Sequence, residues 1–222
     1  MPTQIRKKNK RMGPPTGSRA ANATETRDRI LKAGVTQFAL HGFTGARIDS
    51  ICTSADVNAR MVYHYFNDKA GLYIAVLEYA LGQLRTEELN LDVSKSEPLD
   101  GLLKMFDFMF DHFSEHPELI RLLSAENLLQ AKFLKSSDAT PIMASPVISH
   151  IRTLIQKGIA SKSIRSDVDP LHLYVAMVAF CYFHKSNCHS LAVIFGAEIM
   201  SQQWRAEHKS VARKMLVAYL AP

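Results

Sequence analysis

Apolar residues recur at helical spacing along most of the chain, beginning shortly after residue 20. Asn22 followed by Glu25 fits a capping box at the start of the first helix, and Gly42 is a typical stop signal at its end. Two short segments and a long one follow at the same spacing. We predict helices over 22–41, 47–54 and 58–66, and one that begins near residue 67 or 68 and runs past Leu84.

Proline marks the predicted start of four later helices. It suits the first turn because it has no N–H to leave unpaired there. With a final amphipathic segment, they give predicted helices over 97–115, 117–134, 146–161, 170–188 and 198–220. No segment alternates between apolar and polar residues as a β-strand does. The chain is therefore expected to be all-α.

The first 21 residues combine Lys and Arg with Gly, Pro and Ser, which is typical of a disordered segment. Residues 1–29 carry eight basic and two acidic side chains, and the remaining 193 residues balance 19 against 19. Such an arm suits a polyanion, since each neutralised phosphate releases counterions. A solubilising tail is the alternative. We divide the chain into a disordered basic arm (1–21), a small helical domain (22–67) and a larger helical domain (68–222).

Composition narrows the class further. Hydrophobic residues make up 47% of the 222 residues, yet no window approaches 18 uncharged apolar residues, so we expect no membrane span. The N-terminus has no apolar stretch behind its charges, which argues against a secretory signal. Cys52, Cys181 and Cys188 are too few and too scattered for a disulfide framework. The expected location is the cytoplasm.

Residues 42–69 contain two helices too short to bury themselves, joined by a three-residue turn. The helix before them supplies the base they need. Small residues at Cys52 and Ala55 allow the short helices to approach closely, Val57 fills the corner, and Asn58 can cap the second helix. This arrangement is a helix-turn-helix, which holds the front of its second helix in a DNA major groove.

The same stretch resembles the signature of the TetR family of regulators over roughly residues 24–75. The matching residues are Phe43, Ile48, Ile51, Ala55, Val57, Asn58, Val62, Tyr63, Tyr65, Phe66, Asp68, Lys69, Leu72 and Tyr73. The resemblance implies about nine helices, a divergent C-terminal effector domain, dimerisation through the last two helices, and repression that a small ligand relieves.

The resemblance also assigns candidate DNA contacts. Tyr63, His64 and Lys69 match family positions that contact phosphates. At Lys69, the positive N-terminal end of the next helix's dipole also favours a bound phosphate. The base-facing front of the recognition helix is formed by Asn58, Ala59, Arg60 and Met61. Arg60 is suited to a bidentate contact with guanine, while Ala59 or Met61 can meet a thymine methyl group. Arg47 is expected to contact the DNA backbone or the edge of a base.

Two positions depart from the family pattern. Ala46 stands where Thr or Ser is usual, which removes a hydroxyl that Thr44 can replace, and Asp56 stands where Gly is frequent. Residues 44–69 carry three basic and three acidic side chains, so the motif has no net charge. We therefore expect DNA affinity to depend on the basic arm.

The larger domain contains a segment, 102–116, that is apolar almost all round and rich in Met and Phe, side chains that adapt to apolar or aromatic ligands. An ordinary core is the alternative. The candidate effector contacts are Met105, Phe108, Met109, His112, Tyr174, Met177 and Cys181.

Two groups of His and Cys are open to a second interpretation. His112 and His116 lie one turn apart, and Cys181, His184 and Cys188 follow at helical spacing. Either group is compatible with metal binding or redox sensing, but a pair lacks a third ligand and packing explains both patterns more simply. We expect no metal and no cofactor.

The last helix carries a seam at three-four spacing that would pair with residues 171–185 of the preceding helix in a four-helix dimer interface. Its members are Val178, Trp204, His208, Val211 and Met215. Two recognition helices related by a two-fold axis read a palindrome, which one helix cannot.

The sequence therefore predicts a homodimeric regulator that binds a palindromic operator in double-stranded DNA and is released by a small apolar or aromatic effector. An activator or a ligand-independent regulator is the first competing hypothesis. A metal-dependent all-α enzyme and a non-specific nucleic-acid binder are two more. No nucleophile–base pair, phosphate loop or HExxH motif supports an enzyme.

Overall fold

The computed structural model describes residues 16–93 and 95–222, and the regular secondary structure in this part of the chain is all helix, with no strand. The helices are α1 (Thr16–Gly45), α2 (Ile48–Ala55), α3 (Ala59–Phe66), α4 (Lys69–Asn90), α5 (Pro98–Glu115), α6 (Pro117–Leu128), the 3₁₀ turn η1 (Leu134–Ser136), α7 (Ala139–Ala160), α8 (Pro170–Ser186), α9 (Cys188–Phe195) and α10 (Gln202–Leu220). The predicted all-α class is confirmed.

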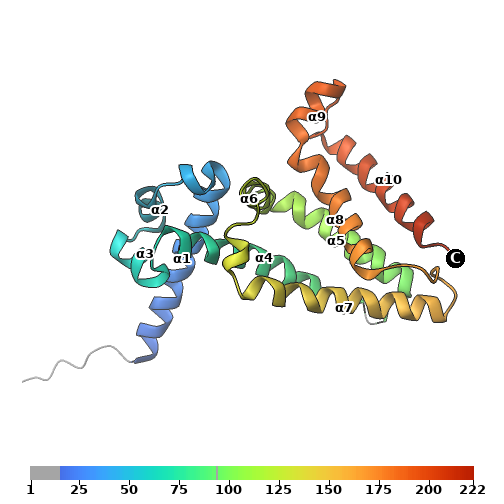
Figure 1. Ribbon diagram of the computed structural model, residues 1–222, viewed down its shortest axis with the longest axis horizontal. Coiled ribbons are helices and arrows are strands. Elements are labelled where there is room, and N and C mark those ends of the chain that lie inside the picture. The colour runs from blue at the N-terminus through green and yellow to red at the C-terminus, as the bar shows by residue number, and fades with distance from the viewer. Residues whose placement is uncertain (1–15, 94) are drawn as a thin grey trace, which may run out of the picture.

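The helices form an N-terminal and a C-terminal assembly joined by α4 (Figure 1). Helices α1 to α3 pack together at one end, and α1 also contacts α4 and α6. Helices α4, α5, α7 and α8 contact one another in the larger assembly, against which α10 packs through α5 and α8. Helix α4 therefore belongs to both parts.

One core supports the N-terminal assembly. Phe38 of α1, Ile51 of α2, Val62 of α3 and Tyr73 of α4 are all fully buried in it. The chain bends at Gly42, whose φ of 64° is a conformation that glycine adopts at little cost, and one further helical turn continues to Gly45. Gly42 thus interrupts the helix where the sequence predicts a stop.

The predicted start of the first helix is wrong. Helix α1 begins at Thr16, so residues 16–21 are helical where a disordered segment was expected, and Asn22 lies inside the helix instead of capping it. The Asn22 carbonyl accepts a hydrogen bond of 2.7 Å from the Thr26 hydroxyl. The rest of the predicted arm, residues 1–15, lies outside the described residues.

Helix α6 ends at Leu128, six residues before the predicted end at 134. The chain turns there because Gln130 and Ala131 both adopt positive φ, 55° and 56°. The buried Glu126 carboxylate accepts hydrogen bonds from the backbone N–H groups of Phe133 and of its neighbour, at 3.2 and 3.1 Å, and so fixes the turn. Sequence periodicity does not reveal such a carboxylate-bound loop.

Other boundaries also differ from prediction, among them the start of the last helix, α10, at Gln202 where 198 was predicted. Helix α7 begins at Ala139, so Pro146 lies inside it and does not open it. The predicted helix over 170–188 is two helices, because α8 ends at Ser186 and Cys188 begins α9. The described residues therefore form ten α-helices where the resemblance implies about nine. None of the described helices is long and apolar enough to cross a membrane.

Candidate nucleic-acid interface and ligand cavities

Helices α2 and α3 meet at a tight turn built as the sequence predicts. Cys52 and Ala55 are buried where the two helices approach, and Val57 packs against the core. Asp56 adopts the left-handed conformation, with φ 52° and ψ 54°, and its N–H donates to the carbonyls that end α2. This backbone conformation explains why glycine suits the position.

Side-chain caps fix the start of the recognition helix α3 and the start of the next helix, α4. The Asn58 Oδ1 atom accepts a hydrogen bond of 3.1 Å from the N–H of Met61, as predicted. Just beyond α3, the Asp68 Oδ1 atom accepts one of 2.7 Å from the N–H of Gly71 and so caps α4. Each cap thus fixes the start of its own helix and leaves the front of α3 unobstructed.

The front of α3 is exposed, while Val62 and Phe66 anchor its back in the core. Among the candidate DNA contacts, the exposed residues are Arg47, Asn58, Arg60, Tyr63 and His64. Ala59, Met61 and Lys69 are partly exposed. The fold thus presents these residues as the sequence predicts, and their contacts with DNA remain predictions.

Two of these candidates have local roles as well. Arg47 is the N-cap residue of α2, with extended backbone and no side-chain cap. The Lys69 ammonium lies over the Phe43 ring, 5.0 Å from its centroid, and donates a hydrogen bond of 3.3 Å to the Thr44 carbonyl. These contacts hold the Lys69 side chain across the junction between α1 and α4, where a phosphate would compete for the same protons.

The sequence did not single out Arg29 as a member of the site. This exposed residue and Thr26, both on α1, line a surface hollow together with Asn58 and Met61 of the recognition helix. A cation at this place can contact a phosphate beside the groove that α3 reads. The only sequence signal was its membership of the basic N-terminal segment.

An aromatic cluster couples the helix-turn-helix to the larger assembly. Phe133, from the loop after α6, lies 4.3 Å from the ring centroid of Phe43 and 5.0 Å from that of Tyr73. Phe38 packs edge-on against Tyr73 at 4.8 Å. Direct packing therefore joins the loop after α6 to the base of the helix-turn-helix.

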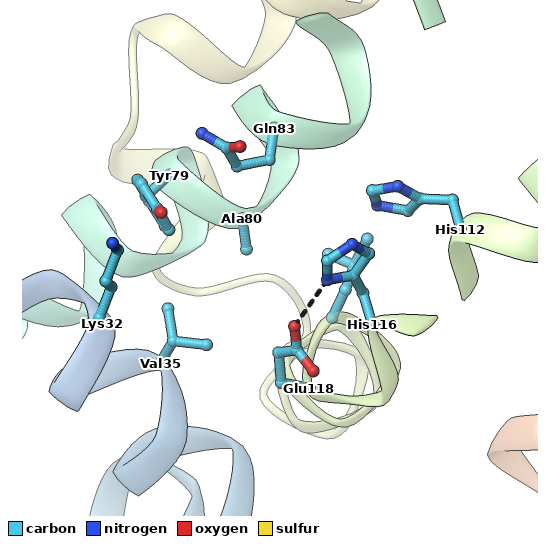
Figure 2. Close-up of a pocket in the computed structure, with 9 residues that line it drawn as sticks. Lys32, Val35, Tyr79, Ala80, Gln83, His112, His116 and Glu118 are labelled. Atoms are coloured by element: carbon cyan, nitrogen blue, oxygen red, sulfur yellow. Dashed lines mark hydrogen bonds and ion pairs between the residues drawn. The ribbon is translucent and has the colours of Figure 1, made fainter. Parts of the chain in front are cut away.

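A cavity of about 200 Å³ opens between α1, α4, α5 and α6 (Figure 2). Its lining residues are Lys32, Val35, Tyr79, Ala80, Gln83, His112, His116, Glu118 and Leu119. His112 is buried, and its Nδ1 atom lies 3.0 Å from the Glu87 carboxylate. Burial lowers the pKa of His112, an effect that the hydrogen bond to Glu87 opposes.

Two family models match the chain. The model described as "Bacterial regulatory proteins, tetR family" covers residues 30–76, and "Tetracyclin repressor-like, C-terminal domain" covers residues 98–216, more than half of the chain. This chain belongs to the TetR family. The second match extends the family assignment well beyond the helix-turn-helix from which the sequence resemblance was drawn.

Named relatives support the assignment. The chain is 35% identical over 192 residues to the HTH-type transcriptional repressor NicS of Pseudomonas putida, covering 86% of this chain and 91% of NicS. It is 36% identical over 109 residues to the HTH-type transcriptional repressor SCO4008 of Streptomyces coelicolor, covering 49% of this chain and 53% of that protein. The molecule is thus a transcriptional regulator of this family with a helix-turn-helix DNA-binding domain.

Solved structures share the fold. A TetR family transcription regulator from Marinobacter aquaeolei aligns with a TM-score of 0.66 at 19% identity, over 91% of this chain and 98% of that one. The reduced form of Escherichia coli NemR aligns with a TM-score of 0.64 at 22% identity, over 88% and 97%.

Most candidate effector contacts of this TetR-family regulator lie in its core. Met105, Met109, Met177 and Cys181 are at most 1% exposed, and neither they nor Tyr174 and Phe108 line the cavity beside α4. Of the predicted set, His112 alone lines that cavity. Contact of the other six with an effector therefore remains a prediction, and their position fits the alternative of ordinary core.

Tyr174 instead joins a polar network between α4 and α8. Its hydroxyl donates a hydrogen bond of 3.2 Å to the Glu88 carboxylate, and Arg85 donates to both groups. Burial raises the pKa of Glu88 although the guanidinium of Arg85 opposes the shift. Arg85 and Glu88 both belong to α4, so the network joins α4 to α8 through the Tyr174 hydroxyl.

A second cavity of about 600 Å³ lies between α6, α8 and the segment that includes α9, and its wall includes His184, Cys188 and Arg205. His184 stacks on Phe110 at 5.4 Å, and its Nε2 atom is buried without a hydrogen-bond partner. Burial and then the neighbouring His208 lower the pKa of His184 to about 4. Cys181 is not among the residues that line this cavity, and its buried thiol has a raised pKa.

Helices α8 and α10 carry apolar side chains on their outer faces. Val211 and Met215 of the predicted seam are 46% and 53% exposed, and Val178, Trp204 and His208 are partly buried. The surface extends along α8 through Leu171 and Val175, both more than half exposed. This surface supports the predicted seam and leaves the dimer itself a prediction.

Proposed function

We propose that this regulator is a cytoplasmic repressor that binds a palindromic operator as a homodimer and leaves it when a small effector enters the helical assembly. The repressor role is supported by NicS and SCO4008, both named transcriptional repressors. The observation that carries the proposal is the exposed front of α3, capped by Asn58 and backed by buried Val62 and Phe66.

The side chains on this surface have two roles in DNA recognition, base contact and phosphate contact. Arg60 reads guanine from the front of α3, and Tyr63 and His64 contact phosphates at its end. Lys69 adds a cation at the N-terminus of α4, where the helix dipole also favours a phosphate. Arg29 extends this contact line onto α1.

Dimerisation places two such surfaces on one face of the duplex. The apolar surface along α8 and α10, with Val175, Val211 and Met215 at least 46% exposed, is the part of the chain suited to a two-fold interface. Paired in this way, two recognition helices have to meet successive major grooves roughly 34 Å apart.

Effector release acts through α4. Only two residues separate this helix from the end of α3, and it also supplies Tyr79 and Gln83 to the cavity beside His112. A ligand that wedges between α4 and α6 tilts α4, and the two recognition helices then no longer fit the groove spacing. The Phe43–Phe133 contact connects the loop after α6 to the same helices and so offers a second route.

The test starts with duplexes selected by the full chain from random DNA. On the selected site, Arg60→Ala should lower affinity about 10- to 100-fold and relax specificity at one position per half-site, as expected for a base contact worth roughly 1–3 kcal/mol. Lys157→Ala, a change at an exposed residue of α7, should leave binding unaltered. Arg60→Ala that binds the selected site as the parent does would refute the proposed reading helix.

A further inference from the structure

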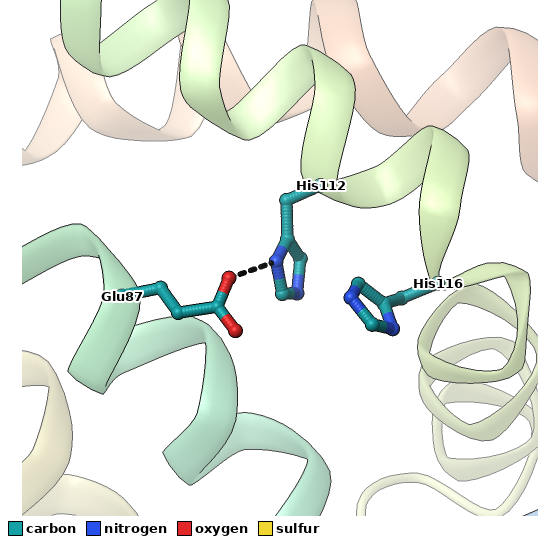
Figure 3. Close-up of side chains that lie close together, drawn as sticks. All are labelled: Glu87, His112 and His116. Carbon is teal, nitrogen blue, oxygen red and sulfur yellow. Dashed lines mark hydrogen bonds and ion pairs between the residues drawn. The ribbon is translucent and has the colours of Figure 1, made fainter.

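We propose that Glu87, His112 and His116 form a binding site for a divalent transition metal ion of the zinc class. Glu87 projects from the end of α4, His112 from the last turn of α5, and His116 from the junction of α5 with α6 (Figure 3). One ligand atom from each residue lies within 4.8 Å of the other two. Within residues 16–93 and 95–222, no other group of three His, Cys, Asp or Glu side chains is so arranged.

The geometry is close to that of a metal site. Zinc holds His nitrogen and carboxylate oxygen about 2.0–2.2 Å away in a tetrahedron, so two of its ligand atoms lie roughly 3.3 Å apart. Nδ1 of His112 and Oε2 of Glu87 are 3.0 Å apart, and the imidazole centroids of His112 and His116 are separated by 4.3 Å. The ligand atoms lie at most 4.8 Å apart, so their separations have to shorten by about 1.5 Å at most to bind an ion.

The burial of the three residues allows that contraction. His112 is only 3% exposed and is held within α5, whereas the side chains of Glu87 and His116 are 44% and 42% exposed. Half-exposed side chains change rotamer at little cost. A fixed imidazole with two movable ligands is thus able to close on an ion without displacing a helix.

A carboxylate behind His116 orients it as in many metal sites. Its Nδ1 atom lies 3.0 Å from Oε1 of Glu118, which leaves Nε2 as the nitrogen available to an ion. Carboxylates that bond the outer nitrogen of a ligating imidazole fix its tautomer and raise its basicity. Glu118 is therefore a positioning residue in this arrangement.

Three protein ligands leave one tetrahedral position open. His112 and His116 line the cavity beside α4, and Tyr79 and Gln83 occupy the same face of α4 as Glu87, at intervals of four residues. The open position is therefore available to water or to an oxygen or nitrogen donor of a cavity ligand. A bound ion would tie α4 to the α5–α6 junction, and the metal site itself does not depend on the proposed effector mechanism.

The experiment uses the purified full chain, stripped with a chelator and titrated with Co²⁺ and then with Zn²⁺ in competition. We expect one equivalent of Co²⁺ per chain, with the visible absorption of a four-coordinate ion. Loss of an orienting carboxylate alone typically weakens a metal site 10- to 100-fold, so Glu87→Gln and His116→Ala should each weaken it about 100-fold or more. The exposed control His189→Ala should bind as the parent does.

Thermal unfolding monitored by circular dichroism shows whether each variant is folded, which is expected because Glu87 and His116 are half-exposed. Three results would overturn the proposal. These are the absence of saturable binding, unchanged affinity in both ligand variants, and loss of the ion in His189→Ala.

Discussion

Because Gly71 has no side chain, the start of α4 can lie directly against the backbone at the end of the recognition helix. A Cβ atom at this position would lie 2.1 Å from the Phe66 carbonyl oxygen, at the last residue of α3. The obstacle is backbone, so it cannot rotate away as a side chain would. Gly71→Ala therefore has to push the end of α3 away from the start of α4 by about 1 Å, as in other overpacked sites.

The magnitude follows from three contributions. Overpacking of a tight site costs about 1–3 kcal/mol. The shift also strains the 2.7 Å hydrogen bond that Gly71 donates to Asp68, a cap worth about 1 kcal/mol. In the opposite direction, the higher helix propensity of alanine than of glycine stabilises the fold by about 1 kcal/mol. The net loss in the free energy of unfolding is thus about 1–3 kcal/mol.

Two assays check this prediction. The midpoint temperature of thermal unfolding should fall by about 2–4 °C for each kcal/mol of stability lost in a domain of this size. Fluorescence anisotropy on the selected operator should show affinity at least about tenfold weaker, because α3 no longer lies at its angle to α4. Gly45→Ala, at the solvent-exposed end of α1, is the matched control. An added Cβ atom there would lie 3.3 Å from Cβ of His41, so this change should cost less stability than Gly71→Ala. A Gly71→Ala protein with unaltered stability and affinity would refute this account of the junction.

Three further predictions concern the arm, the interface and the buried histidine. Deletion of residues 1–20 should weaken DNA binding strongly and flatten the dependence of affinity on salt, because fewer phosphates are neutralised; an unchanged slope would contradict the role given to the arm. Met215→Glu places a charge in the apolar seam, so sedimentation should show a monomer that no longer binds the operator; a variant that still dimerises and binds would contradict the interface. His184 has a pKa lowered to about 4 in the folded chain, so its contribution to stability is complete above its ordinary pKa of 6.5 and is lost as the pH falls from 6.5 through 4. Urea unfolding of His184→Phe should show a flatter stability profile in that window, by up to about 3 kcal/mol, and an equally steep profile would exclude His184 as the cause.

The helix-turn-helix was predictable because its information is local. Asn58 caps α3, and Cys52, Ala55 and Val57 shape the turn through neighbours a few residues away in the sequence. Proline at a helix-start position likewise located α5 to within one residue of its start at Pro98. Each of these features depends on backbone hydrogen bonds and spacings within one or two helical turns.

The features that sequence reasoning missed depend on distant contacts. Glu126 ends α6 by binding the backbone of the loop that carries Phe133, and the hydropathy pattern gives no sign of this. His112 and His116 lacked a third ligand in the sequence because Glu87 lies 25 residues away on another helix. The Met and Phe residues of α5 look alike whether they line a cavity or fill a core, and only packing separates the two.

The most direct test of the central claim is hydroxyl-radical footprinting of the full chain on its selected duplex. Two α3 helices in successive major grooves predict two protected patches, related by a two-fold axis and about 10 base pairs apart from centre to centre. The Met215→Glu variant should lose both patches together. A single asymmetric patch, or protection that Met215→Glu leaves intact, would contradict the account of a dimer that reads a palindrome.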